Sequence, residues 1–212
     1  MTPIRRLLET VHLTFAGLWL GSLVMTGVAA AVIFPVVRDL NPQLPDFAEY
    51  AGPHWRIAAG TVAARIFLIS DAIQLGCIII CGLTLGAIVI TVEGWQRPIA
   101  TSIRLIALFC AIGLMTYSFA FLGPRMNTNM VEYWAAARAG DNEAAATFQA
   151  AFDEDHPTAT KLMIGSFLCA LLLTSSGALA AAGATGAHRP EPSPSKSRLE
   201  QPSLTKRRRG GT

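Results

Sequence analysis

Four long stretches of the chain contain no Asp, Glu, Lys or Arg, and this pattern restricts the fold more than any other feature. They cover residues 11–37, 72–92, 105–124 and 162–187, and each has at least 20 residues. A helix needs roughly 20 residues to cross a hydrocarbon core of about 30 Å. Lipid excludes open sheets, and the chain lacks the alternating pattern of a membrane barrel. The sequence therefore predicts an all-α fold, a four-transmembrane-helix bundle in residues 1–187.

Composition supports a membrane protein over a soluble one. Charged residues make up 15% of the chain, against about 25% in soluble domains. The first apolar stretch also has features of a signal peptide, because Arg5 and Arg6 precede it. It is longer than the roughly 7–15 apolar residues of a signal segment, and this favours a retained helix.

Residues 188–212 form a tail of different composition. Pro, Ser, Lys and Arg dominate it, which predicts a disordered segment. Its run "KRRR" (206–209) is a candidate contact for anionic lipid heads, although a positive-inside anchor is the favoured interpretation. We expect the lipid bilayer to be the main partner and expect no nucleic acid.

Charge along the chain predicts the orientation. If the N-terminus is cytoplasmic, the inner segments hold most of the Lys and Arg, and the acidic residues gather in the outer segments. We therefore expect both termini in the cytoplasm and a multi-pass protein of the cell (inner) membrane. Between the third and fourth spans we expect a short helical hairpin, with helices over 126–139 and 143–155 separated by "GDN" (140–142).

Small residues mark the helices for close packing. Gly17 and Gly21 in the first span, and Gly82 and Gly86 in the second, have the GxxxG spacing that lets membrane helices approach. Trp19 lies too deep for the interfacial belt and is predicted to pack between helices.

A group of polar residues is predicted at the outer mouth of the bundle. Asp71 precedes 21 uncharged residues, which span about 31 Å at 1.5 Å each, so it lies near the outer edge of the hydrocarbon. Arg125 and His156 arrive at the same edge from the third and fourth spans. Arg65 and His54 lie behind them on the second. These five residues are the candidate site.

The sequence leaves two interpretations of Arg125. Gly123 and Pro124 are predicted to break or kink the third span just before it. Arg125 either snorkels to water as a stop charge or pairs with Asp71 and joins two helices.

The spacing of the histidines and cysteines does not identify a cofactor. His156 and His54 with a carboxylate form a candidate metal or proton site, but their spacing does not support one. His12 is predicted at the opposite end of the bundle, as an interfacial residue. That position argues against a haem held by His12 and His156 together. The four cysteines are interpreted as small packing residues, and the cofactor stays unknown.

Three segments resemble the TMEM205-like domain family, over roughly residues 8–185. In "VHLTFAGLWLGSLVMTGVAAAVIFP" (11–35) the matching residues are His12, Trp19, Gly21, Phe34 and Pro35. In "FLGPRMNTNM" (121–130) they are Pro124, Arg125 and Met130, and in "FDEDHPTATKLMIGSF" (152–167) they are Phe152 and His156. The resemblance implies an integral membrane protein of four helices. It implies no established reaction.

Together these observations predict a non-enzymatic four-helix membrane protein. Its outer polar patch would bind a small ligand, an ion or a partner protein, and a structural or assembly subunit is an equally good interpretation. The alternative is a haem- or metal-binding membrane redox protein. A transporter needs polar groups at mid-bilayer, where the sequence offers Thr26, Thr84 and Ser166 and no charge. A homo- or hetero-oligomer stays open.

Overall fold

The computed structural model describes residues 2–91 and 98–186, and their side chains as far as residue 180. The predicted tail, 188–212, lies outside these ranges. The helices are α1 (Pro3–Leu40), α2 (His54–Val89), α3 (Pro98–Tyr117), α4 (Gly123–Arg138) and α5 (Asn142–Gly186). Two short elements are η1 (Pro45–Phe47), a 3₁₀ turn, and η3 (Ser118–Leu122), a π-helical segment.

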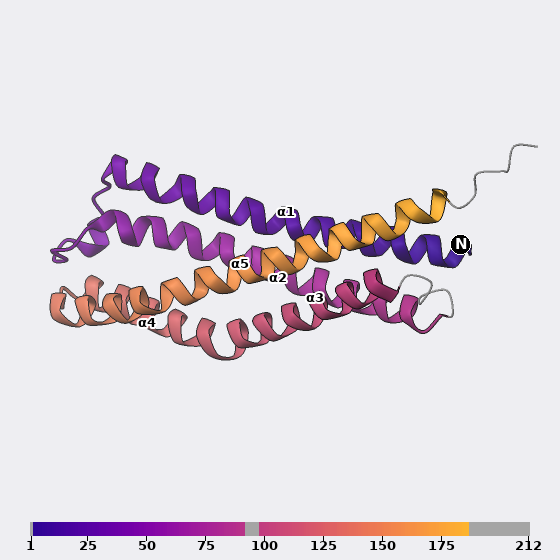
Figure 1. The fold of residues 1–212 in the computed structure, drawn as a ribbon. Helices are drawn as coiled ribbons and strands as arrows, with labels where there is room; N and C mark the ends of the chain where they lie inside the picture. Colours follow the sequence, from indigo (N-terminus) through magenta and orange to yellow (C-terminus); the bar gives the residue numbers. More distant parts are fainter. Residues whose placement is uncertain (1, 92–97, 187–212) are drawn as a thin grey trace, which may run out of the picture.

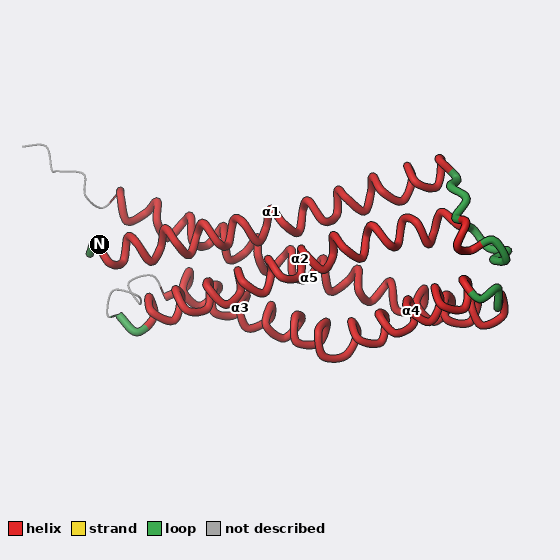
Figure 2. Tube along the Cα trace, turned by 180° about the vertical axis from the view of Figure 1, so that it is seen from behind, coloured by secondary structure: helices red, strands yellow, loops and turns green. Residues whose placement is uncertain are grey.

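The predicted all-α four-helix bundle is confirmed. The described residues contain four helices long and apolar enough to cross a membrane, over 3–40, 54–89, 98–138 and 142–180. Figure 1 shows them as long rods lying side by side, with the N-terminus and the end of α5 at one end, called here the terminal end. The α1–α2 loop and the α4–α5 turn lie at the other, the loop end (Figure 2).

The predicted hairpin between the third and fourth spans is built from the spans themselves. α3, η3 and α4 form one continuous helical run, and α5 continues through Pro157 into the membrane. The turn between the arms depends on Gly140, which has a φ of +75°. A Cβ there would lie 2.8 Å from Cβ of Glu49 in the α1–α2 loop, so only glycine allows the loop and the turn to meet.

The third span does not stop at Pro124, because η3 accommodates the proline. Pro124 has no N–H, and in a regular helix its ring clashes with the carbonyl four residues earlier. The N–H of Gly123 instead reaches the carbonyl of Ser118, five residues back. This wider turn interrupts the regular helical hydrogen bonds immediately before Pro124. A π-bulge is a recognised cause of helix bending.

α1 and α2 pack as an antiparallel pair with a heptad-like seam. Buried positions on α1 alternate in steps of four and three: Arg5, Glu9, His12, Ala16, Trp19, Leu23 and Thr26. α2 has the same steps in Ser70, Gln74, Cys77, Cys81, Thr84 and Ile88. The contacts Thr26–Ser70 and His12–Thr84 lie 14 residues apart on each helix, which fixes one register over two heptads. As predicted, Trp19 packs between helices and is fully buried.

The GxxxG residues of α1 do not serve this packing. A Cβ added at Gly17 or Gly21 would meet no atom within 4 Å, and both glycines are exposed. In the second span, a Cβ added at Gly82 would lie 3.9 Å from Leu108, and one added at Gly86 would meet no atom within 4 Å. Compactness comes from the seam and from α5, which packs along α1, α3 and α4.

Ala16 and Gly17 are adjacent in sequence, and their substitutions should behave differently. Ala16 is fully buried in the seam, so Ala16→Leu should lower the free energy of unfolding by about 1–3 kcal/mol through overpacking. Gly17→Leu is the matched control and should cost nothing, because its side chain enters open space. Thermal unfolding in detergent micelles measures both. An equal loss in the two variants would show that Gly17 packs against protein.

Candidate functional site

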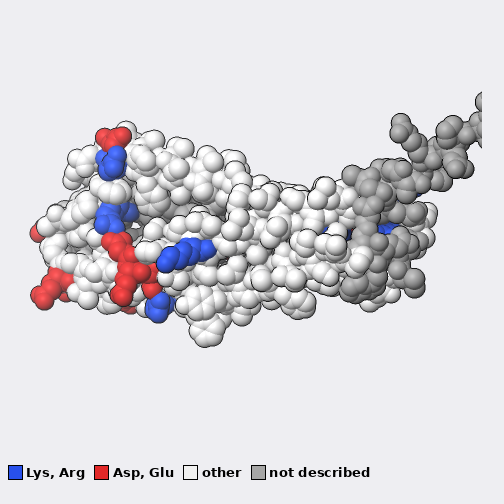
Figure 3. All heavy atoms as spheres, in the orientation of Figure 1, with Lys and Arg blue, Asp and Glu red and all other residues white. Residues whose placement is uncertain are grey.

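Two ion pairs lie at the two edges of the apolar part of the bundle. Arg104 on α3 binds Glu9 at 2.9 Å near the terminal end, and Arg125 on α4 binds Asp155 near the loop end. The 21 residues from Arg104 to Arg125 rise about 31 Å at roughly 1.5 Å each, which matches a hydrocarbon core of about 30 Å. Figure 3 shows charged side chains gathered at the loop end and none in the middle of that face. The two pairs therefore mark the edges of the membrane-crossing part.

Arg125 pairs with Asp155 rather than with Asp71, which corrects one of the two sequence-based interpretations. Its Nε donates to Oδ2 of Asp155 at 2.7 Å and its Nη2 donates to Oδ1, a bidentate contact. No hydrogen bond or ion pair joins Arg125 to Asp71 within the described ranges. The cause is the packing order, since α4 lies along α5. Because the Arg125 side chain remains 60% exposed, it also reaches water.

Asp71 belongs instead to a polar chain between α1 and α2. Nε2 of Gln74 donates to Oδ1 of Asp71 at 3.4 Å and to Oγ of Ser70 at 3.2 Å. Oγ1 of Thr26 lies 2.6 Å from Oγ of Ser70, and Nε1 of Trp19 donates to Oε1 of Gln74 at 3.5 Å. This chain crosses the helix interface within the outer half predicted for the bilayer.

The three remaining patch residues have separate surroundings. His54 fixes the loop, because its Nδ1 accepts from the N–H of Leu44 at 2.9 Å and its Nε2 donates to the carbonyl of Tyr50 at 3.1 Å. Arg65 is exposed and makes no hydrogen bond or ion pair to another described residue. His156 is exposed, and its ring lies 5.9 Å from that of Phe152, one turn earlier, in a tilted arrangement. Among the described residues, no hydrogen bond or ion pair links any two of the five predicted patch residues.

The loop end has a hydrophobic core of its own. It consists of Phe47, Tyr50, Ile57, Tyr133, Ala137 and Ala145, from the loop, α2, α4 and α5. The hydroxyls of Tyr50 and Tyr133 lie 2.9 Å apart inside it. The ion pair of Arg56 with Asp153, at 2.7 Å, joins α2 to α5 beside it. This second core makes the loop end a folded platform beyond the apolar slab.

A groove of about 410 Å³ opens on this platform. It is lined by Leu44, Phe47, Ile57, Ala58, Thr61, Val62, Trp134 and Arg138. The guanidinium of Arg138 lies 5.0 Å from the centre of the Phe47 ring, a cation–π contact. Arg138 makes no ion pair with another described residue, so the groove combines an apolar lining with one uncompensated positive charge.

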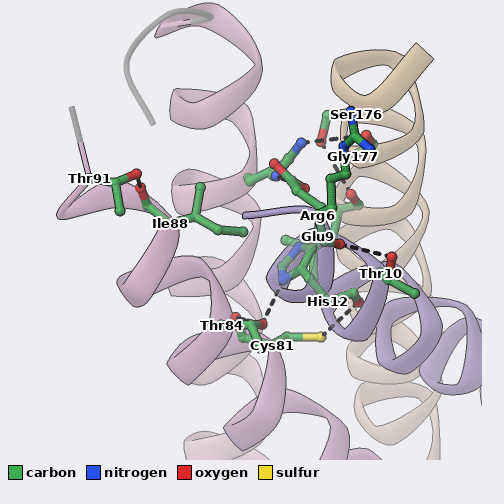
Figure 4. A network of polar contacts seen from close by, with 12 residues as sticks. Arg6, Glu9, Thr10, His12, Cys81, Thr84, Ile88, Thr91, Ser176 and Gly177 are labelled. Carbon is green, nitrogen blue, oxygen red and sulfur yellow. Dashed lines mark hydrogen bonds and ion pairs between the residues drawn. The ribbon is translucent and has the colours of Figure 1, made fainter. Parts of the chain in front are cut away.

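The terminal end contains a buried charged cluster that the sequence did not predict as a site. Figure 4 shows Glu9 and His12 of α1 between Thr84 of α2 and Gly177 of α5. Nη1 of Arg104 donates to Oε2 of Glu9, and its Nη2 donates to the carbonyl of Gly177 at 3.4 Å. The side chains of Arg104 and Glu9 are 2% and 6% exposed. A buried arginine at membrane depth needs such partners.

His12 is part of this cluster and is fully buried between helices, and its predicted place near the inner membrane edge stays a prediction. Its Nδ1 lies 3.0 Å from Oγ1 of Thr84, and its backbone carbonyl lies 3.8 Å from Sγ of Cys81. The sequence signal for this burial was the four-and-three spacing of Glu9 and His12 with Ala16. From the sequence, Arg104 was interpreted only as a charge that sets the topology, and its spacing did not indicate a buried partner.

Cofactor binding stays a prediction. In the part of the chain that the structure describes, no group of three or more His, Cys, Asp or Glu residues is placed to hold a metal ion. His12 and His156 lie at opposite ends of the bundle, as the sequence predicted. The described cysteines are unpaired thiols, and Cys77, Cys81 and Cys169 are buried as packing residues.

The fold and the four spans define a multi-pass helical membrane protein. In comparisons with known proteins, no family model, curated protein or solved structure matched the chain. The resemblance to the TMEM205-like family therefore depends on the three short motifs alone.

Breaking the Arg104–Glu9 pair should strongly destabilise the protein. Arg104→Gln leaves the Glu9 carboxylate buried without its cation, which costs about 3–5 kcal/mol. Arg6→Gln, at an exposed arginine on the same end, is the control and should change the free energy of unfolding by less than about 0.5 kcal/mol. Chemical unfolding in micelles measures both, and similar losses would contradict the buried pair.

The partner of Arg125 can be tested with two double-mutant cycles. Arg125→Gln and Asp155→Asn should be non-additive, because the second substitution removes an interaction already lost. Arg125→Gln and Asp71→Asn should be additive within about 0.3–0.5 kcal/mol. The midpoint of unfolding is the readout. The reverse pattern would restore the pairing with Asp71.

Proposed function

We propose that this chain is a non-enzymatic, multi-pass protein of the cell (inner) membrane that binds an anionic amphiphile in its loop-end groove. The ligand class is a molecule with an apolar chain and a carboxylate or phosphate head. The observation that carries the proposal is the groove of about 410 Å³, in which an apolar lining meets the unpaired guanidinium of Arg138. The loop end faces away from the cytoplasm in the proposed orientation.

The size and chemistry of the groove support a small ligand. Its volume falls within the roughly 300–1,000 Å³ of small-molecule sites. Leu44, Ile57, Val62 and Trp134 supply apolar contact along its walls. Arg138 supplies the charged donor, which can bind a carboxylate or phosphate through two parallel hydrogen bonds.

The position of the groove supports an amphiphile as its ligand. Thr61 and Val62 lie on α2 roughly three turns before Asp71 and Gln74, hence on the head-group side of the apolar slab. An anionic amphiphile meets water, head groups and hydrocarbon at this depth. The tyrosine-filled core beneath keeps the groove preformed, which reduces the ordering cost of binding.

The lining favours binding over catalysis. Its eight residues include one hydroxyl, that of Thr61, and one cation, and they include no imidazole, thiol or carboxylate. Covalent catalysis needs a nucleophile within hydrogen-bond reach of a base. The groove supports no such pair, so binding is the function it fits best. On the three matching motifs, we also propose membership of the TMEM205-like family.

Binding can be measured with a dansyl-labelled C11 fatty acid and protein in phosphatidylcholine nanodiscs. We expect saturable energy transfer from tryptophan, and little transfer to a dansyl probe with the same chain and an ammonium head. Arg138→Gln should weaken fatty-acid affinity about tenfold, the effect of losing a charged hydrogen bond of about 1.4 kcal/mol. Thr61→Trp should abolish binding by filling the groove.

The matched control is Arg38→Gln, which removes an exposed loop-end arginine that pairs with Asp39 outside the groove. It should leave affinity unchanged. Transfer no greater than in empty nanodiscs, or equal affinity in the three variants, would overturn the proposal. A groove that serves a partner protein would give that result.

A further inference from the structure

Nε2 of His12 and Nε of Arg104, both in the terminal-end cluster, are buried polar atoms without a hydrogen-bond partner in the described protein. His12 is 0% exposed and Arg104 is 2% exposed, so neither atom reaches bulk solvent. A buried donor or acceptor left unsatisfied costs about 1–3 kcal/mol, and native proteins nearly always supply a partner.

The two atoms lie in the same region of the bundle. Glu9 and His12 are three residues apart on α1, so their side chains project from the same face with Cβ atoms about 5–6 Å apart. Glu9 holds the guanidinium of Arg104 at 2.9 Å. Glu9 therefore brings the guanidinium of Arg104 beside the face of α1 that carries His12. This placement makes a single small molecule between the two side chains a candidate partner for both atoms.

Hydrogen bonding around Thr84 determines which ring nitrogen of His12 is a donor and which is an acceptor. Oγ1 of Thr84 donates to the carbonyl of Ile80 at 2.8 Å, so its lone pair is available to Nδ1 of His12 at 3.0 Å. Nδ1 then carries the proton of a neutral ring, and Nε2 is an acceptor. Nε of Arg104 is always a donor. The site thus presents one donor and one acceptor.

This combination selects among possible ligands. An anion requires donors on every side, and the lone pair of Nε2 repels it. A metal ion requires acceptors, and the guanidinium of Arg104 repels it. Water accepts and donates at once, and buried waters typically make about three hydrogen bonds to otherwise unsatisfied groups.

We propose that an ordered water molecule binds in the terminal-end cluster, where it accepts a hydrogen bond from Nε of Arg104 and donates one to Nε2 of His12. Gly177 allows the approach of α5 to this place. A Cβ there would lie 3.8 Å from Nε of Arg104 and 2.6 Å from Cδ2 of Leu13. The water connects α1 to α3 in parallel with the Glu9–Arg104 ion pair, so the cluster is a hydrated, neutral-histidine site at the membrane edge.

The direct test is a map of the full-length protein in lipid at about 2 Å resolution. We expect a peak within hydrogen-bonding distance, about 2.7–3.2 Å, of both Nε2 of His12 and Nε of Arg104. His12→Phe should remove the peak while the Glu9–Arg104 contact remains. Cys81→Ala is the matched control, because it removes only the contact of Sγ with the His12 carbonyl and leaves both ring nitrogens and Thr84 in place, so the peak should persist.

A second measurement uses only the wild-type chain and so does not depend on the variants folding. Solid-state NMR of ¹⁵N-histidine-labelled protein in lipid should show His12 as a neutral ring protonated at Nδ1. A ring protonated at Nε2 would overturn the proposal, because the site would then present two donors. An ordered map without a peak, or one with a tetrahedral anion or a multiply coordinated ion there, would overturn it as well.

Discussion

The structure depends on pairing buried charge at the edges of the hydrocarbon. An arginine with a 2%-exposed side chain is tolerable at membrane depth only if its donors are satisfied. Nη1 and Nη2 of Arg104 meet this condition through Glu9 on α1 and a backbone carbonyl on α5, and the proposed water would meet it at Nε. One side chain therefore joins three helices that are distant in sequence. Because the pair is lost if any of these helices slides or rotates, it also fixes how far each extends toward the terminal end.

The α1–α2 seam fixes the relative position of these two helices along the rest of the apolar part. Its ends are polar, with His12 and Thr84 at one and Thr26 and Ser70 at the other. Between them, Ala16 and Cys77 are almost completely buried and apolar in character. Polar layers specify register, because a shifted pairing would leave their groups unsatisfied, and apolar layers contribute packing. Arranged in this way, the seam holds α1 and α2 in one register.

Sequence reasoning was sufficient where the signal is local. The charge-free stretches located all four spans. It failed where the answer depends on helix rotation. The pairing of Arg125 with Asp71, one of two interpretations left open, rested on depth alone. Depth admits both Asp71 and Asp155, and only the packing of α4 on α5 decides between them. Arg104 was counted only as a topology charge for the same reason. The four-and-three spacing from Arg5 to Thr26 indicated a buried helix face. Polar residues occupy several of these positions, so the face was not recognised.

α5 provides a second measure of the membrane thickness. It carries Asp155, the partner of Arg125, and Gly177, whose carbonyl accepts from Arg104. These residues are 22 positions apart, which corresponds to about 33 Å of helix at 1.5 Å per residue. The third span gives about 31 Å between its two arginines by the same rise. Two helices with unrelated sequences therefore place the same two levels one hydrocarbon thickness apart. By this measure the groove of Arg138 lies beyond one of the two levels and the histidine cluster lies near the other, so the two candidate sites are at opposite ends of the apolar part.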